Sequence, residues 1–329
     1  MKTALRILLV TVVALAVTLY LLTPEKLARV SATPSLPADL DDWLSDSEAA
    51  APYPLIPGTE KRIRWHAGSG EKTAYAIVYL HGFSASRQEI YPTMDIVAEA
   101  LGANLFETRL SGHGRSEGAL EGVVAEQWLD DAAEALAVGA RLGDKTILVG
   151  TSTGATLAVA MAGHELMSGV SDVVLISPNF ALADDRAALL TKPAGPQLAD
   201  LLIGDTRTFD AHNEAHGLYW STTYPTRAVV EAMRLVDYVD NSLPLELPSR
   251  LLVVYSPDDK VISAPAIVGA LEKIATPALE VVRVTETDDL MRHVIAGDIL
   301  SPSTTESVAA AVVDFIGPAD TDPAAESAD

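Results

Sequence analysis

Residues 147–158 read ILVGTSTGATLA, a short apolar run followed by a Gly-x-Ser-x-Gly motif and then by small and apolar residues. This order of residue types predicts a buried strand, a sharp turn that carries Ser152, and a buried helix. Such a turn exposes the serine hydroxyl above a sheet, and Gly150 and Gly154 leave room for the backbone on either side. The stretch therefore predicts that Ser152 is a nucleophile. The alternative is an ordinary glycine-rich turn between a strand and a helix.

The composition of the 329-residue chain restricts the classes of protein to which it can belong. Apolar residues make up 49% of the chain, which is enough for a sizeable core. A formal net charge of −22 argues against nucleic acid as a partner, because phosphate binding requires a basic surface. The chain has no cysteine, which excludes disulfides, thiolate catalysis and cysteine-ligated metals.

Residues 1–23 predict a membrane-directed segment. Lys2 and Arg6 precede a mostly apolar run at residues 7–22, and this pattern is typical of a signal anchor or a signal peptide. The run is a little shorter than the roughly 20 residues that a membrane crossing needs. We favour an uncleaved anchor with the catalytic domain outside the cytoplasm, because positive charges tend to stay inside. The alternative is cleavage near Ala32, which would give a secreted or periplasmic protein.

The sequence that follows divides into a linker and one domain. Residues 24–60 are rich in Pro and Asp and show no sustained apolar period, which predicts a linker that is extended in part, with Trp43 and Leu44 as candidates to dock on the domain. From residue 61 to residue 317, strand-like apolar runs alternate with helix-like patterns. This alternation predicts a mostly parallel sheet with helices on both faces.

Two parts of the chain depart from this alternation. Residues 179–249 contain helical patterns but no convincing buried strand, which predicts a helical cap inserted into the domain. Residues 318–329 are rich in Pro, Ala, Asp and Ser, which predicts a disordered acidic tail.

A nucleophilic serine needs a base, and the base needs a carboxylate that orients it. In a mostly parallel sheet the catalytic groups lie at the carboxyl ends of the strands. Residues 256–262, SPDDKVI, follow one predicted strand, and residues 288–295, DDLMRHVI, follow the next. We therefore predict His293 as the base and Asp259 as the carboxylate, which gives the chain order Ser, Asp, His expected for such a turn.

Other aspartates are alternatives to Asp259. Asp258 is its neighbour, and because adjacent side chains on a loop point in different directions, we expect only one of the two to reach His293. Asp288 and Asp289 lie close to His293 in sequence and are weaker alternatives.

The oxyanion formed by attack on a carbonyl needs backbone N–H donors. Thr153, directly after the nucleophile, is predicted to supply one donor, and Phe83, in the loop after an early strand, is predicted to supply the other. His81 and His113 lie in Gly-containing loops, and we interpret both as residues that brace these loops rather than as catalytic groups.

These motifs resemble those of the α/β-hydrolases, close to the branch of monoacylglycerol lipases, carboxylesterases and serine aminopeptidases. The resemblance covers about residues 62–317 and is carried by HGFS at 81–84, SGHGRS at 111–116, GTSTG at 150–154, SPDDKVI at 256–262 and RHVI at 292–295. It implies an α/β-hydrolase fold and no cofactor. It also supports Asp259, because the family carboxylate commonly precedes x-Val-(Val/Ile). Because the family commonly has a bulkier residue at the position of Thr151, the resemblance does not specify the acyl pocket.

The resulting prediction is a serine hydrolase that cleaves carboxylic ester bonds through an acyl-enzyme, with lipid-derived esters such as monoacylglycerols as expected substrates. An acyltransferase or peptidase with the same triad is one alternative, and a non-catalytic binding module is another. His212 and His216 are four residues apart, but Asn213 stands where a zincin has glutamate, so we expect no metal. Nothing in the sequence indicates an oligomeric state.

Overall fold

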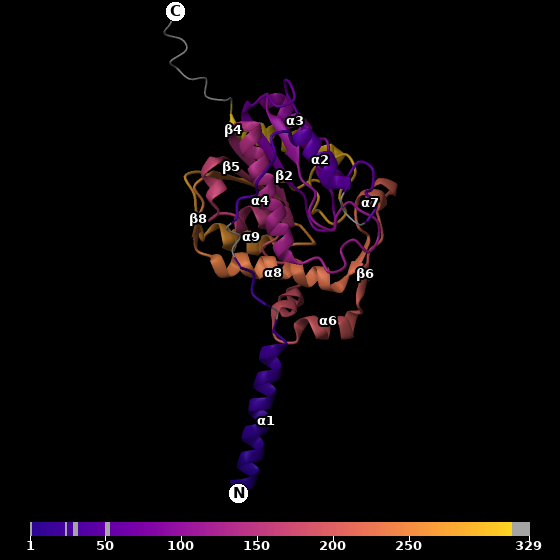
Figure 1. The fold of residues 1–329 in the computed structure, drawn as a ribbon, viewed down its shortest axis with the longest axis vertical. Coiled ribbons are helices and arrows are strands. Elements are labelled where there is room, and N and C mark those ends of the chain that lie inside the picture. Colours follow the sequence, from indigo (N-terminus) through magenta and orange to yellow (C-terminus); the bar gives the residue numbers. More distant parts are fainter. Residues whose placement is uncertain (1, 24, 29–31, 50–52, 318–329) are drawn as a thin grey trace, which may run out of the picture.

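The computed structural model describes residues 2–23, 25–28, 32–49 and 53–317, which form a globular body from which one helix, α1 (Lys2–Leu21), projects (Figure 1). The predicted disordered tail at residues 318–329 lies outside the described residues.

A seven-stranded sheet forms the centre of the body, in the strand order β1-β3-β2-β4-β5-β9-β11. Every neighbouring pair is parallel except β1 and β3. The apolar runs of the sequence form its buried middle, where Leu148 of β4 lies between Val78 of β2 and Val173 of β5. The strands are β1 (Arg62–Arg64), β2 (Thr73–Leu80), β3 (Asn104–Glu107), β4 (Gly143–Thr151), β5 (Val170–Ile176), β9 (Arg250–Tyr255) and β11 (Leu279–Arg283).

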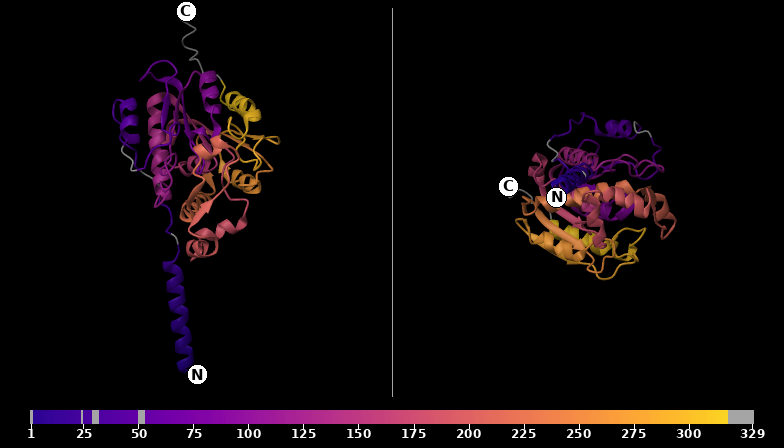
Figure 2. Two further views of the ribbon diagram at one scale, coloured as in Figure 1. Left: turned by 90° about the vertical axis from the view of Figure 1, so that its right-hand side faces the viewer. Right: turned by 90° about the horizontal axis from the view of Figure 1, so that it is seen from below.

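Helices cover both faces of this sheet (Figure 2). Because side chains alternate along a strand, Val78 and Leu80 join one core cluster, whereas Ile77 and Tyr79 join the other. The first cluster includes residues of α4 (Ala125–Leu142), α5 (Thr153–Ala160), α8 (Thr226–Ser242) and α9 (Ala264–Leu271), and the second includes residues of α3 (Thr93–Leu101) and α10 (Thr305–Ile316). The predicted mostly parallel sheet with helices on both faces is confirmed.

The region predicted as a cap lies between β5 and β9. Its last helix, α8, is amphipathic and buries Ala228, Leu235 and Val239 in the same core cluster as α4 and α5, so this helix covers the sheet as well as belonging to the insertion. The other elements of the region are η3 (Asp185–Thr191), α6 (Gly195–Ile203), β6 (Thr206–Thr208), α7 (Glu214–Tyr219), β7 (Thr223–Pro225) and β8 (Leu245–Glu246). The short elements elsewhere are η1 (Arg87–Ile90), η2 (Glu165–Gly169), β10 (Ile274–Ala275) and η4 (Pro302–Thr304).

The N-terminal region differs from the prediction in two respects. Across the described residues, no helix has the length and apolarity that a membrane crossing requires, so the predicted membrane segment at residues 1–23 is not supported. Residues 24–60, predicted as a linker that is extended in part, include a helix, α2 (Leu40–Ala49), that packs on the domain. Leu40 and Leu44 are buried in the main core cluster and Trp43 packs against it, so Trp43 and Leu44 dock on the domain as predicted.

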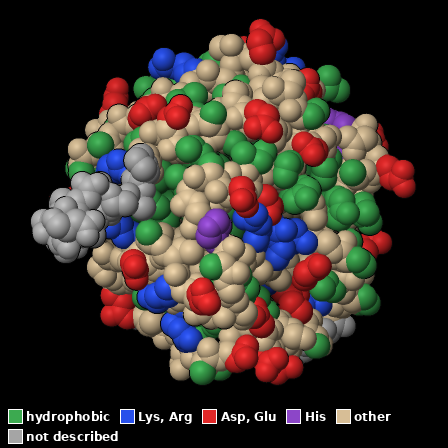
Figure 3. Space-filling model, turned by 90° about the horizontal axis from the view of Figure 1, so that it is seen from above, with side chains coloured by type: hydrophobic (Ala, Val, Ile, Leu, Met, Phe, Trp, Pro, Cys, Tyr) green, Lys and Arg blue, Asp and Glu red, His purple; other side chains and the backbone are tan. Residues whose placement is uncertain are grey.

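Acidic and basic side chains lie interspersed with apolar ones on the face of the body opposite α1 (Figure 3). This mixture is typical of a solvated protein surface and does not resemble the basic stripe that nucleic acid binding requires.

Candidate active site

Ser152 stands at the sharp turn between β4 and α5. It is the N-cap residue of α5 and has φ 52° and ψ −115°, a conformation that non-glycine residues rarely adopt. The turn is tight because α5 packs directly against the sheet. A Cβ atom on Gly154 would lie 2.0 Å from the carbonyl oxygen of Leu80, and one on Gly150 would lie 2.4 Å from the carbonyl oxygen of Gly154. The two glycines of the motif are therefore required by close backbone contacts.

The structure brings Ser152, His293 and Asp259 together. The Nε2 atom of His293 lies 3.0 Å from the Ser152 hydroxyl oxygen, and the Nδ1 atom lies 2.7 Å from Oδ2 of Asp259. The other carboxylate oxygen of Asp259 accepts hydrogen bonds from the backbone N–H groups of Val261 and Ile262, at 2.8 and 2.9 Å. These two contacts fix the carboxylate in the orientation in which it meets the imidazole.

The alternative aspartates occupy other positions. Asp258 points into solvent, with 65% of its side chain exposed, and pairs with Arg292. Asp288 accepts a hydrogen bond from Ser303 N. Asp289 is buried beside the base but contacts its backbone, since its Oδ2 accepts from the N–H groups of His293 and Val294 at 2.9 and 3.0 Å. Of these four aspartates, only Asp259 contacts the imidazole ring.

The environment of His293 favours its protonated form. Burial by itself lowers the pKa of this imidazole, but the Asp259 carboxylate raises it through charge and hydrogen bonding, and Glu89 and Asp289 add to the rise, so the net pKa lies above its usual value. An imidazole in this environment can accept a proton and is stabilised as a cation while it holds that proton.

The predicted oxyanion donors are Thr153, which follows Ser152, and Phe83, which follows a glycine that lies close to Ser152. Thr153 is the first residue of α5, and its N–H has no acceptor within the helix because helices leave their first N–H groups unpaired. In the loop after β2, Gly82 N donates to Glu89 and Ser84 N donates to His113. The intervening Phe83 N–H has no hydrogen-bond acceptor within the part of the chain that the structure describes.

Two buried histidines hold this loop and the loop at residues 109–116 together. His81 Nε2 accepts from Leu110 N at 3.0 Å, and His113 Nε2 accepts from Ser84 N at 3.0 Å, so each loop supplies a ring to the other. The Nδ1 atom of His113 lies 3.1 Å from Ser111 O, which places the ring proton there. Burial lowers the pKa of His113 to about 4 and that of His81 well below its usual value, so both rings are neutral near pH 7. This geometry fits the predicted bracing role.

Comparison with known proteins supplies the family. A family model described as "Alpha/beta hydrolase family" matches residues 77–298, which include the turn at Ser152 and the loops of Asp259 and His293. The chain belongs to the alpha/beta hydrolase family. No curated protein matches this alpha/beta hydrolase in sequence.

Solved structures share the fold of this alpha/beta hydrolase at low sequence identity. A structure from work on the metagenome-derived lipolytic enzymes LipS and LipT has a TM-score of 0.62 and 20% identity, and the match covers 80% of this chain and 98% of that one. A monoglyceride lipase of Saccharomyces cerevisiae, solved as a soluble variant, has a TM-score of 0.60 and 13% identity over 89% and 97%. A monoacylglycerol lipase of Paleococcus ferrophilus has a TM-score of 0.58 and 12% identity over 78% and 97%.

Sequence reasoning missed one buried carboxylate of the alpha/beta hydrolase site. Glu89, in η1, is 2% exposed, and its Oε2 accepts from Gly82 N at 2.8 Å and from the Tyr79 hydroxyl at 3.0 Å. A Cβ atom on Gly82 would lie 2.6 Å from Oε1 of Glu89 and 3.2 Å from Cβ of Ser152, so the carboxylate and the nucleophile are neighbours. Burial raises the pKa of Glu89. The sequence offered no signal, because Glu89 stands in a polar segment that does not differ from a surface turn.

The insertion contacts the same loop of the alpha/beta hydrolase. Ser221 N donates to the carbonyl oxygen of Ser84 at 2.7 Å, and the rings of Phe83 and Tyr224 meet edge to face with centroids 5.0 Å apart. Ser152 and His293 are only 7% and 8% exposed. The insertion therefore packs directly on the loop at residues 81–84.

The histidine pair of the cap is engaged in packing. His216 is 6% exposed, accepts a hydrogen bond from His212 N at 3.1 Å and packs against Phe209 and Trp220. His212 lies 3.8 Å from Asp289. Within the described residues, no group of three or more His, Cys, Asp or Glu side chains is arranged to hold a metal.

Proposed function

We propose that this alpha/beta hydrolase cleaves carboxylic ester bonds through a serine nucleophile. The observation that carries the proposal is the pair of contacts that joins Ser152 to His293 at 3.0 Å and His293 to Asp259 at 2.7 Å, with Ser152 held on a left-handed turn. Three loops that are far apart in sequence supply these side chains, and the order of contacts is the one that proton transfer from the serine requires.

The proposed reaction has two halves. The Ser152 oxygen attacks the ester carbonyl while Nε2 of His293 takes the hydroxyl proton, and the N–H groups of Phe83 and Thr153 bind the oxyanion. The tetrahedral intermediate collapses as His293 returns the proton to the departing alcohol, which leaves an acyl-enzyme. Water, deprotonated by His293, then attacks the acyl carbonyl, and Ser152 leaves with the proton. Asp259 orients the imidazole and stabilises its cation throughout.

The proposed substrates are esters of long-chain acyl groups, with monoacylglycerols as the first class to test. Two of the solved structures with this fold are described as monoacylglycerol or monoglyceride lipases. In this chain, α6 of the cap exposes Leu198, Leu201 and Leu202 with exposed fractions of 51%, 78% and 77%. An apolar surface on the insertion, whose Ser221 and Tyr224 contact the loop at residues 83–84, suits an acyl chain better than a polar substrate.

Labelling of the full chain with a fluorophosphonate probe, followed by ester turnover, tests the proposal. We expect the wild type and Ser168→Ala to be labelled, because Ser168 is an exposed serine away from the site, and Ser152→Ala to remain unlabelled. Hydrolysis of p-nitrophenyl esters and monoacylglycerols of increasing chain length then ranks the substrates. Folded wild type that is neither labelled nor active on any ester would refute the proposal.

A further inference from the structure

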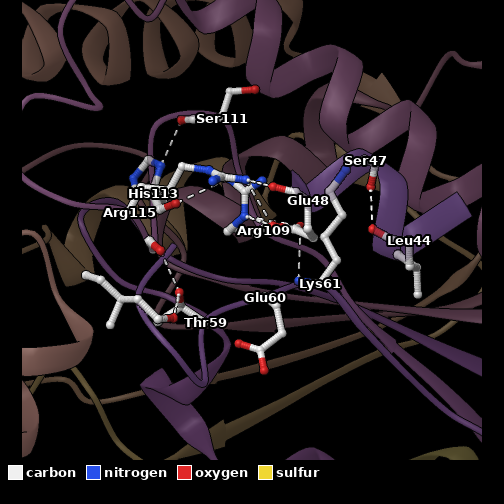
Figure 4. A network of polar contacts seen from close by, with 12 residues as sticks. Leu44, Ser47, Glu48, Thr59, Glu60, Lys61, Arg109, Ser111, His113 and Arg115 are labelled. Carbon is white, nitrogen blue, oxygen red and sulfur yellow. Dashed lines mark hydrogen bonds and ion pairs between the residues drawn. The ribbon is translucent and has the colours of Figure 1, made fainter. Parts of the chain in front are cut away.

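The helix α2 packs against the domain outside the stretch that matches the family model, which begins at residue 77. Its apolar side chains anchor it, since Leu40 and Leu44 are 5% and 8% exposed, and Trp43 is half-buried against the same cluster. The anchored helix presents Glu48, near its C-terminal end, to the loop at residues 109–116 (Figure 4). The segment is thus part of the surroundings of the site.

Glu48 is the anion between two buried guanidinium groups. Its Oε2 atom accepts from Arg109 Nε at 3.0 Å and from Arg115 Nη2 at 3.1 Å, and its Oε1 atom lies 3.3 Å from the backbone nitrogen of Lys61. The side chains of Arg109, Arg115 and Glu48 are 8%, 5% and 10% exposed. Burial and the neighbouring charge of Arg109 lower the pKa of Arg115, whereas Glu48 raises it. Two adjacent buried cations require such an anion.

The residues after Glu48 hold the same loop through its backbone. Gly114 is the main point of contact, because its carbonyl oxygen accepts from Ile56 N at 3.0 Å and from the Thr59 hydroxyl at 2.6 Å. A Cβ atom on Gly114 would lie 2.6 Å from that hydroxyl oxygen, so loop and segment are in close contact. Within the loop, Arg109 Nη1 donates to His113 O at 3.3 Å.

This loop contacts the loop after β2 through Leu110 N and through the side chain of His113. His113 accepts the hydrogen bond of Ser84 N, the residue after Phe83, whose N–H has no acceptor among the described residues. A series of contacts therefore runs from Glu48 through Arg109 to His113 (Figure 4). The bond from Ser84 N to His113 continues it to the loop that carries the predicted oxyanion donor.

We propose that Glu48 is a positioning residue of the active site: by pairing with Arg109 and Arg115 it fixes the loop that carries His113, and through His113 it fixes Phe83 N–H where the oxyanion forms. The inference rests on the proposed function, because the oxyanion arises from attack on an ester. It assigns residues 40–60 a part in catalysis rather than the part of a spacer.

The test compares Glu48→Gln with the wild type in the full chain, with active sites counted by the fluorophosphonate probe. We expect kcat per active site to fall by roughly 10- to 100-fold, a part of the loss that follows removal of a whole oxyanion donor. KM is expected to change by less than about threefold, because the contacts that bind the substrate equally well in the ground state and the transition state are unaltered. The acidic limb of the pH profile is expected to stay in place, since His293 and Asp259 are untouched. Glu48→Asp, which keeps the charge, should restore part of kcat, and Asp46→Asn, an exposed change on the same helix, should match the wild type.

Hydrogen exchange gives a readout that does not depend on turnover. We expect amide exchange in residues 82–86 to be faster in Glu48→Gln than in Asp46→Asn. Wild-type kcat per active site in folded Glu48→Gln would overturn the proposal, as would unchanged exchange in that loop. If Glu48→Gln does not fold, Glu48→Gln combined with Arg115→Gln, which removes a cation together with the anion, is judged by the same criteria. Inactivity of the wild type would count against the proposed function alone, because the exchange result still decides the role of Glu48.

Discussion

Replacement of Gly154 by alanine tests the geometry of the nucleophile turn. The added Cβ atom would lie 2.0 Å from the carbonyl oxygen of Leu80 and 2.7 Å from that of His81, where ordinary van der Waals contact begins at 3.4 Å. Both obstacles are backbone atoms at the end of β2, so they cannot rotate away, and α5 must shift by more than about 1 Å. A misplacement of that size at a reacting group costs roughly 100-fold in rate. Overpacking of a tight core costs about 1–3 kcal/mol in the free energy of unfolding.

The assay for Gly154→Ala is ester turnover per folded molecule together with thermal unfolding. We expect kcat/KM to fall at least roughly 100-fold and the Tm to fall by about 2–4 °C for each kcal/mol lost, the scale for domains of about 150–250 residues. Gly269→Ala is the matched control, because a Cβ atom on Gly269 of α9 has nothing within 4 Å. Alanine is the better helix former, so this control should gain about 0.5–1 kcal/mol. A Gly154→Ala variant with wild-type kcat/KM would show that α5 is not held against β2 as described.

Two further predictions concern protonation. Asp259→Asn should lower kcat by roughly 10³- to 10⁴-fold. The acidic limb of the kcat/KM profile should also move to lower pH, because the Asp259 carboxylate raises the pKa of His293. Near-wild-type turnover in this variant would show that another carboxylate orients the base. His113 has a pKa of about 4 when folded and buried, against about 6.5 when unfolded. The unfolded chain therefore binds more protons in that window, and stability should fall by on the order of 3 kcal/mol as the pH drops from about 6.5 to about 4. Denaturant unfolding at both ends of the window should show a smaller fall in His113→Gln, and an equal fall would refute the burial argument.

The central fold and the proximity of Ser152, Asp259 and His293 were predictable because the signals for them are local. A buried strand needs a run of apolar residues, and the turn at Ser152 needs glycines at fixed positions, so both appear directly in the sequence. The contact between His293 and Asp259 was predictable because parallel strands bring their carboxyl ends to one edge of the sheet. The structure distinguishes Asp259 from Asp258 by a feature that the spacing of residues in the sequence does not reveal. The backbone N–H groups of Val261 and Ile262 bind the Asp259 carboxylate and turn it inward.

The supporting contacts could not be predicted because they depend on residues that are far apart in the chain. Glu48 and Glu89 are charged residues in polar segments, and their burial depends on partners that are distant in the chain, Arg109 for the first and Gly82 for the second. The helix α2 has an apolar face of only a few residues, and most of its stability comes from packing rather than from its own sequence. A pattern that describes one element at a time contains neither kind of information.

The charges around the loop at residues 109–116 fit one requirement, which is that His113 must stay neutral. Only a neutral ring with its proton on Nδ1 can accept the hydrogen bond of Ser84 N. Burial lowers the pKa of His113, and the positive charge of Arg109 lowers it further. Arg109, which donates to the carbonyl oxygen of His113, can remain buried because Glu48 pairs with it. Glu48 therefore has two linked effects: it ties the loop to α2, and it allows a buried cation to lie where that cation keeps His113 an acceptor.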